Sequence, residues 1–288
     1  DRMVEQLGES AKIDRSQTKD AIMTSIYGSE AQPKEIFGTG IMYSIFQKTM
    51  GEMAPAVWAM NQGFLDIWNP NALSNDWVLP DNFHVHVKVM NQVKEVVQFL
   101  NQPFDTFYRA NMPMERGRSL CANTTHSIDG MVVREMVRRC NYNPYTVRRV
   151  QQLIYREWDI PSEIEIDEDV EMCQILWGHY ERTGYLSARI LDYINENTIH
   201  LVDRMVLNDL VQSLPSKPFQ LLTVHDCFRC LPTYGNDLRK QYNIQMASLA
   251  KSNILADLLT QITGRPITIG KLDPDMWKLA LDAEYSLS

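Results

Sequence analysis

The chain has 288 residues, 44% of them hydrophobic, and a net charge of −8, which fits a soluble globular protein with a sizeable core. It has no apolar run of about 18 residues and no basic, then apolar, signal-peptide start, so neither a membrane span nor secretion is expected. Five cysteines predict reduced thiols in a cytoplasmic protein rather than a disulfide framework.

The first half of the chain predicts two helical regions and then a strand. Residues 14–27 predict a helix with Asp14 as its N-cap and Gly28 as its stop. Residues 36–68 are rich in Met, Ile, Phe and Trp and also predict helix. Polar residues and valines alternate over residues 83–90, which predicts a strand. Residues 91–100 either extend this strand or turn away from it.

The second half predicts mostly helix. The predicted helices cover residues 129–140, 145–157, 169–213 and 235–262. Pro215 and Pro218 precede an apolar run, residues 219–224, that predicts a buried strand. The expected fold class is therefore α+β, mostly helical, with a small antiparallel sheet.

The first helix carries an unusual stripe of side chains. Arg15, Lys19, Met23 and Tyr27 are spaced four residues apart. Each step of four turns a helix face by only about 40°, so these side chains line one side. A packing stripe would be apolar, whereas two cations, a thioether and a phenol suit a polyphosphate at one end and a sugar and base at the other.

Three motifs in order resemble single-subunit RNA polymerases of phages and mitochondria, which have the right-hand polymerase fold. Arg-x3-Lys-x7-Tyr-Gly, starting at Arg15, resembles their motif B. Residues 124–130, Thr-Thr-His-Ser-Ile-Asp-Gly, look like their His-Ser-x-Asp-Gly element. Residues 222–228, Leu-Thr-Val-His-Asp-Cys-Phe, look like motif C. The resemblance implies a fingers region and part of a palm, whose small sheet carries motif C.

Weaker similarities fill the gaps between these motifs. Residues 76–83, Asp-Trp-Val-Leu-Pro-Asp-Asn-Phe, resemble the family's Trp-Val-Thr-Pro-Asp-Gly-Phe strand, and residues 253–257 and 282–288 resemble later segments. One departure is clear: His126 and His225 are 99 positions apart, against a few tens in the family. The predicted domains are therefore 1–75 (fingers with motif B), 76–140 (fingers and palm), 141–215 (helical insertion) and 216–288 (palm and tail).

The resemblance assigns the nucleotide-binding roles. Arg15 and Lys19 would hold the triphosphate, Arg as a two-pronged fork and Lys as a mobile charge that could also protonate pyrophosphate. Met23 would line the pocket and Tyr27 would close it. His126 would lie near the ribose 2′-hydroxyl, where a polar partner discriminates against its absence. The alternatives for these residues are an ordinary surface helix, a core tyrosine and a structural histidine.

The same resemblance assigns the metal site and its supporting residues. Asp226 would bind the two Mg²⁺ ions of nucleotidyl transfer, with a plain turn aspartate as the alternative. His225 would support that turn, Asp129 would order the loop around His126, and Gly28 would end the first helix. Cys227 and Cys230 have CxxC spacing, but no second ligand pair accompanies them, so a zinc or redox site is not favoured.

The polymerase family has a first metal-binding aspartate in motif A, and nothing in this sequence resembles that motif. We therefore expect upstream residues or a second polymerase subunit to supply motif A and the N-terminal region, as in short-tailed phages that divide this enzyme between two chains. The other expected partners are template DNA, the RNA transcript and ribonucleoside triphosphates, in the cytoplasm of an infected bacterium. Two alternatives stay open, a DNA polymerase of the same superfamily and a non-catalytic nucleic-acid-binding subunit.

Charge is segregated along the chain. Residues 157–171 hold eight acids and no base, and without them the net charge is zero. Six arginines lie just before this acidic run: Arg134, Arg138, Arg139, Arg148, Arg149 and Arg156. Either a nucleic-acid contact or a solvated helix face accounts for these arginines.

Overall fold

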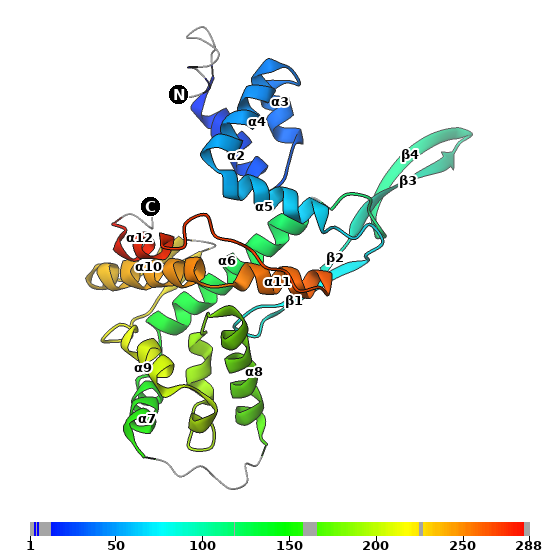
Figure 1. Cartoon of the computed structure of the whole chain (residues 1–288). Coiled ribbons are helices and arrows are strands. Elements are labelled where there is room, and N and C mark those ends of the chain that lie inside the picture. The colour runs from blue at the N-terminus through cyan, green and yellow to red at the C-terminus, as the bar shows by residue number, and fades with distance from the viewer. Residues whose placement is uncertain are drawn as a thin grey trace. The chain divides into compact units, whose positions relative to one another are not determined.

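The computed structural model describes residues 3, 5, 13–117, 119–157, 166–224 and 227–284. The chain forms two compact units: unit 1 combines Asp1–Asn75 with His86–His126, and unit 2 combines Asp76–Val85 with Ser127–Ser288. Helices dominate, and the described strands form small antiparallel pairs (Figure 1). The predicted α+β, mostly helical class is confirmed.

Four helices of unit 1 surround an apolar core. They are α2 (Arg15–Ile26), α3 (Ala31–Phe37), α4 (Ile41–Met53) and α5 (Pro55–Asp66). The core contains Met3, Ala21, Phe37, Phe46 and Met50. Gly38, at φ 71°, follows α3, and Pro55 occupies the first turn of α5, so the region 36–68 is not one helix.

Strands β1 (Ser74–Val78) and β2 (His84–Lys88) pair, and the second confirms the predicted strand over 83–90. Between them the Leu79 amide donates to the Phe83 carbonyl, and Asn82 has φ 56°. This left-handed conformation favours Gly or Asn. Asn82 can therefore occupy the position that is glycine in the similar Trp-Val-Thr-Pro-Asp-Gly-Phe segment of the polymerase family.

A long hairpin follows, formed by β3 (Met90–Phe99) and β4 (Gln102–Asn111) (Figure 1). Residues 91–100 thus belong almost entirely to a strand rather than a turn. Phe99 pairs with Gln102, and the two tip residues, Leu100 and Asn101, both have positive φ. Such a two-residue tip matches the right-handed twist of the strands.

Helix α6 (Ser119–Cys140) begins in unit 1 and ends in unit 2. The predicted helix 129–140 is therefore only its second half. Unit 2 continues with α7 (Pro144–Tyr155), α8 (Glu168–Thr183), the 3₁₀ turns η1 (Ala188–Tyr193) and η2 (Ile199–Leu201), and α9 (Arg204–Gln212). Gly184, at φ 71°, ends α8, so residues 169–213 are several elements rather than one helix.

These elements of unit 2 share one apolar core, which includes Val150, Leu176, Ile190, Ile194 and Leu207. Asp167 caps α8 by accepting a hydrogen bond from the Val170 amide, and the first turn of α8 is acidic. Carboxylates are favourable at the positive end of a helix dipole. This placement gives the C-terminal part of the acidic run a structural role.

The rest of unit 2 is a short hairpin and a group of helices. They are β5 (Leu222–Val224), β6 (Cys227–Arg229), η3 (Pro232–Tyr234), α10 (Gly235–Lys251), α11 (Ile254–Thr263) and α12 (Met276–Asp282). The predicted helix 235–262 is interrupted at Ser252 and Asn253. Among the described helices, none combines the length and apolarity that a membrane crossing requires.

Candidate functional site

The predicted nucleotide-binding stripe lies on the exposed side of α2. Arg15, Lys19 and Met23 are exposed, whereas Ala21 and Ser25 are buried against the core of unit 1. The helix therefore divides its faces: one packs, and the other presents two cations and a thioether to solvent. Neither cation forms an ion pair with any described acidic residue.

Both predicted ends of α2 are confirmed. Asp14 accepts hydrogen bonds from the Ser16 hydroxyl and, at 3.3 Å, from the Gln17 amide, and these bonds lower the pKa of its carboxyl. Tyr27 is the C-cap residue, and Gly28 follows with φ 81°, a conformation that side chains disfavour. The chain therefore turns directly after the stripe.

Tyr27 and His126 lie together within unit 1, although 99 positions separate them in the sequence. Their ring centroids are 5.0 Å apart, with the planes tilted by 43°. Tyr27 is half-buried and His126 is exposed. Two residues predicted to hold the sugar and base are thus neighbours at the end of the cationic stripe.

Asn61, on α5, helps to hold this junction, and no motif or spacing pointed to this residue. Its side-chain amide donates to the Ser25 carbonyl at 3.0 Å, while its Oδ1 accepts from the Cys121 thiol at 3.0 Å. One side chain therefore bridges the end of α2 and the start of α6. Burial raises the pKa of Cys121, which keeps this thiol protonated as a donor.

The His-Ser-x-Asp-Gly element is helical, so the expected loop around it is wrong. Residues 124–130 lie inside α6, and the Thr124 and Thr125 hydroxyls donate to carbonyls one turn earlier. His126 and Asp129 are both exposed and three residues apart, which places them on one side of the helix. Asp129 can support the site from this helix but orders no loop.

The predicted motif C has a paired strand on each side of residues 225 and 226. Val224 pairs with Cys227, and Leu222 pairs with Arg229. His225 and Asp226 themselves lie outside the described residues, so their predicted roles stay predictions. Leu222 and Val224 are more than half exposed, so the expectation of a buried strand over 219–224 is wrong.

The buried apolar residues of this segment precede the strand. Phe219 and Leu221 pack with Met136 of α6 and Leu238 of α10, and the Phe219 ring stacks on Tyr234 at 4.7 Å. This packing fixes the entry to β5. The described residues contain no group of three or more His, Cys, Asp or Glu side chains that could hold a metal ion.

The five cysteines are all free, which agrees with the predicted reduced thiols. Cys227 is exposed and Cys230 is partly buried. Burial raises the pKa of Cys140 to about 12 and that of Cys173 to about 11. These two thiols therefore act as small apolar side chains.

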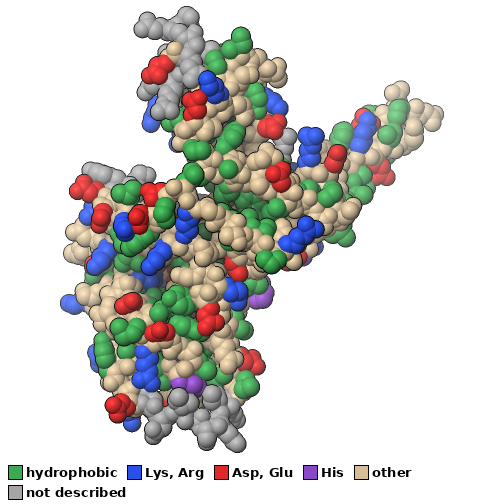
Figure 2. All heavy atoms as spheres, in the orientation of Figure 1, with side chains coloured by type: hydrophobic (Ala, Val, Ile, Leu, Met, Phe, Trp, Pro, Cys, Tyr) green, Lys and Arg blue, Asp and Glu red, His purple; other side chains and the backbone are tan. Residues whose placement is uncertain are grey.

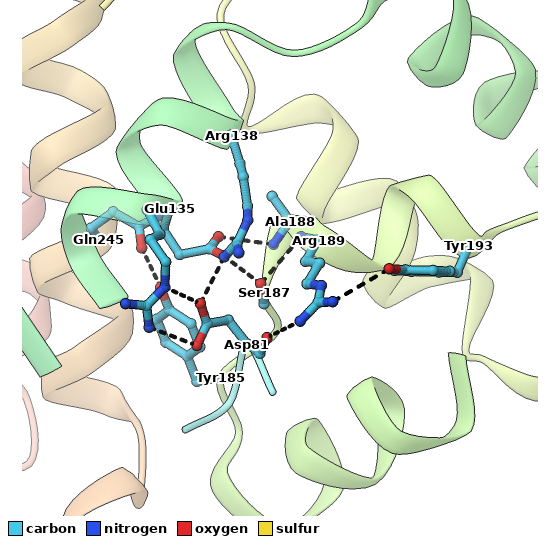
Figure 3. Close-up of polar contacts among 10 residues, drawn as sticks. Asp81, Glu135, Arg138, Tyr185, Ser187, Ala188, Arg189, Tyr193 and Gln245 are labelled. Atoms are coloured by element: carbon cyan, nitrogen blue, oxygen red, sulfur yellow. Dashed lines mark hydrogen bonds and ion pairs between the residues drawn. The ribbon is translucent and has the colours of Figure 1, made fainter. Parts of the chain in front are cut away.

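Unit 2 contains a buried ionic network that the sequence did not reveal (Figure 3). The Asp81 side chain is fully buried and accepts two hydrogen bonds from Arg134, at 2.6 and 3.0 Å, and one from Arg138, at 2.9 Å. Arg138 also donates to the buried Glu135 at 2.7 Å. Arg134 lies over the Phe83 ring at 4.1 Å. Two arginines of α6 therefore hold the turn between β1 and β2.

The network continues into the N-cap and first residues of η1. Glu135 accepts hydrogen bonds from the Ser187 hydroxyl and, at 2.9 Å, from the Ala188 amide. Arg189 donates to the Asp81 carbonyl at 2.8 Å (Figure 3). Burial alone would raise the pKa of Asp81, but the bonds from Arg134 and Arg138 outweigh it and hold this pKa below its ordinary value.

Three of the six arginines before the acidic run are therefore structural. Arg134 and Arg138 pair with Asp81, and the fully engaged Arg139 donates to Gln241 and Ser213 from a position only 3% exposed. Neither a nucleic-acid contact nor a solvated face describes these three. The other three arginines, Arg148, Arg149 and Arg156, are exposed on or beside α7.

A cavity of about 310 Å³ also lies within unit 2. Its polar lining consists of Asn82, Gln174, His179, Arg182 and Gln261. Arg182 bonds to His179 at 2.7 Å and to Asp257 at 3.2 Å, so its charge is already engaged. None of the predicted site residues lines this cavity, and it gives no support for the nucleotide site.

No protein-family model and no curated protein sequence gives a significant match to this chain.

Proposed function

We propose that the chain is part of a DNA-directed RNA polymerase, which transfers nucleotides from ribonucleoside triphosphates on a DNA template. The observation that carries the proposal is the junction of Tyr27 and His126 at the end of the exposed stripe of α2. A cationic row that leads to two neighbouring polar rings suits a triphosphate followed by a sugar and base. A surface helix with no ligand would not require these two distant residues to meet.

Each residue of this surface has a role in the proposal. Arg15 and Lys19 bind the triphosphate, and Lys19 protonates the departing pyrophosphate. Met23 lines the pocket and Tyr27 closes it, while His126 contacts the ribose 2′-hydroxyl. Gly28 lets the chain turn away directly after Tyr27.

Mg²⁺ would supply charge stabilisation and activation of the attacking hydroxyl. Asp226 is the carboxylate that would hold the metal, with His225 in support. In the sequence, both residues fall between the paired strands β5 and β6. The proposal includes a further carboxylate, from upstream residues or from a second subunit, because the sequence has nothing that resembles motif A. The chain would act in the cytoplasm of an infected bacterium.

The proposal is tested by extension of a primer on single-stranded DNA with Mg²⁺, using the complex isolated from the native source. Ribonucleotides are expected to be incorporated and deoxyribonucleotides to be strongly disfavoured. His126→Ala should lower this preference by about tenfold or more, because the 2′-hydroxyl then loses its polar partner. Equal use of both substrates by the unaltered complex would support a DNA polymerase instead. Absence of incorporation, with DNA binding intact, would support a non-catalytic subunit.

Lys19→Ala is expected to lower kcat/KM for the incoming nucleotide by about 100-fold, the order of effect of a general acid that also binds charge. Lys48→Ala is the matched control, since Lys48 is another exposed lysine of unit 1 whose ion pair with Glu52 is long, at 3.9 Å. Single-nucleotide incorporation rates measure both variants. If the two variants behave alike, Lys19 has no role in the reaction.

A further inference from the structure

The two rings of the Tyr27–His126 contact come from different helices, and α5 connects these helices. Tyr27 ends α2, and His126 lies in α6, five residues after Cys121. Figure 1 shows α5 running below α2 toward the start of α6, all within unit 1. The distance of 5.0 Å between the two ring centroids therefore depends on how α5 holds the two helix ends.

Asn61, a partly buried residue of α5, holds the carbonyl at which α2 ends. Its side-chain amide donates to the Ser25 carbonyl at 3.0 Å. The same carbonyl accepts hydrogen bonds from the backbone amides of Tyr27 and Gly28, the second at 2.9 Å. Ser25 is only 3% exposed, so water does not readily take the place of Asn61 there. The link therefore reaches the backbone turn that carries the Tyr27 ring.

The other end of the Asn61 side chain is bonded to α6. The Cys121 thiol donates to Asn61 Oδ1 at 3.0 Å. The Thr125 hydroxyl, one residue before His126, donates to the Cys121 carbonyl at 3.0 Å. Because a carbonyl only accepts hydrogen bonds, the Ser25 carbonyl decides that the amide nitrogen of Asn61 faces α2 and its oxygen faces α6. Both ends of this one side chain are thus committed.

The end of α5 is fixed to the segment before α6 by a tryptophan that follows the helix. The indole N–H of Trp68 donates to the Met114 carbonyl at 2.8 Å. Gly117 lies so close to the Trp68 ring that an added Cβ would come within 1.9 Å of it, so this close approach requires glycine. Because α5 is also anchored beyond Asn61, it gives the Asn61 link a fixed support.

We propose, on the basis of the function proposed above, that Asn61 is a positioning residue that sets the geometry between Tyr27 and His126 and thereby the selection of ribonucleotides. Asn61 acts through the two rings and does not itself contact the nucleotide. A site that selects a hydroxyl depends on the placement of its polar partner, and a displacement of about 1 Å can cost about 100-fold in rate.

Asn61→Leu removes both hydrogen bonds and keeps a side chain of similar size. In the space-filling view, basic, acidic and apolar side chains are interspersed over the helices of unit 1 (Figure 2). The substitution exchanges one neutral group for another and leaves this charge distribution unchanged, so an effect on selectivity cannot come from the electrostatic field. Gln62→Leu is the matched control, because Gln62 is the next amide of α5 and is exposed, with a bond to Asp66 at 2.9 Å.

The first measurement follows the ring contact and requires no activity. The full chain is labelled with carbon-13 in its six histidines and in tyrosine, and the cross-relaxation peak between the Tyr27 and His126 rings is identified by its loss in Tyr27→Leu and in His126→Gln. Asn61→Leu is expected to reduce this peak to less than half, and Gln62→Leu to leave it unchanged. Absence of the peak from the unaltered chain, or an equal peak in Asn61→Leu, would overturn the proposal.

The second measurement is selectivity, the ratio of kcat/KM for a ribonucleotide to that for the matching deoxyribonucleotide, in complexes made in the native host. Asn61→Leu is expected to lower this ratio by about fivefold, and Gln62→Leu to keep it. When His126→Ala is already present, Asn61→Leu should cause no further loss, because it acts through that ring. Equal losses with and without His126 would contradict a positioning role.

Cys121→Ala is a second variant that removes only the α6 end of the link. It is expected to weaken the same peak and to lower the same ratio, so the proposal stays testable if Asn61→Leu does not fold. Expected changes in the peak, with no extension by any complex, would remove the polymerase function and leave Asn61 as the residue that positions the two rings. Normal extension with an unchanged peak would remove only the role of Asn61.

Discussion

Asp226→Ala is expected to reduce nucleotide incorporation by at least about 1,000-fold. The proposed reaction needs Mg²⁺ at the attacking and leaving oxygens, and a metal ion contributes several kcal/mol of charge stabilisation in the transition state. About 4 kcal/mol corresponds to three powers of ten in rate. Asp226→Asn should be equally inactive, since it keeps the size of the side chain and removes its charge. Incorporation rates at saturating nucleotide, over a range of Mg²⁺ concentrations, measure the effect.

Asp66→Asn is the control for this variant, because Asp66 is an exposed carboxylate of α5 whose described partner is Gln62. It should keep the full rate. Because paired strands lie on either side of residues 225 and 226, we expect Asp226→Ala and Asp226→Asn to leave folding intact. Circular dichroism can check this. If the Asp226→Ala complex keeps more than a tenth of the normal rate, Asp226 is not a metal ligand in the reaction.

Asp81→Asn is expected to lower the free energy of unfolding by about 3 kcal/mol, the low end for loss of one partner from a buried ion pair. The substitution leaves Arg134 and Arg138 beside a neutral group that can no longer accept all of their hydrogen bonds. The low end applies because both arginine side chains stay about a quarter exposed. Urea unfolding followed by circular dichroism gives the value.

Asp105→Asn provides the matched control, since its ion pair with Lys94 has similar geometry but both side chains are about half exposed. Exposed pairs contribute about 0–1 kcal/mol, so this variant should be nearly neutral. If Asp81→Asn costs no more than Asp105→Asn, the buried network does not stabilise unit 2.

The Asp81 carboxyl should also make the free energy of unfolding depend on pH in the acidic range. Because the pKa of Asp81 is lower in the folded state, its contribution to the free energy of unfolding is complete above the unfolded-state pKa of about 4. It is lost as the pH falls through the lower folded value. Asp81→Asn should therefore flatten this part of the stability profile.

Local signals in the sequence predicted the ends of α2 and the strand over 83–90. Asp14 and Gly28 act through their own backbone and nearest neighbours, so the sequence is sufficient to place them. The helix breaks were harder to predict. Gly184 lies inside an otherwise helical pattern, and only its positive φ ends α8.

The candidate site likewise has one part that the sequence predicts and another that depends on tertiary packing. The exposed stripe of α2 follows from helical spacing, but the contact of Tyr27 with His126 depends on tertiary packing. The helical state of residues 124–130 was missed because polar Thr, His, Ser and Asp favour caps and turns locally, and the long helix α6 overrides that preference. The partners of Asp81 lie more than fifty positions away, where no local pattern can indicate them.

The uneven exposure of the cysteines has a practical consequence. A thiol reacts as its thiolate, so buried Cys140 and Cys173, with their raised pKa values, are slow targets for alkylating dyes. Cys227 is exposed, and it follows Asp226 directly in the sequence. The natural chain thus offers a labelling position for a fluorophore within the predicted motif C, and a change in the dye's signal on addition of Mg²⁺ or nucleotide would test the proposed site there.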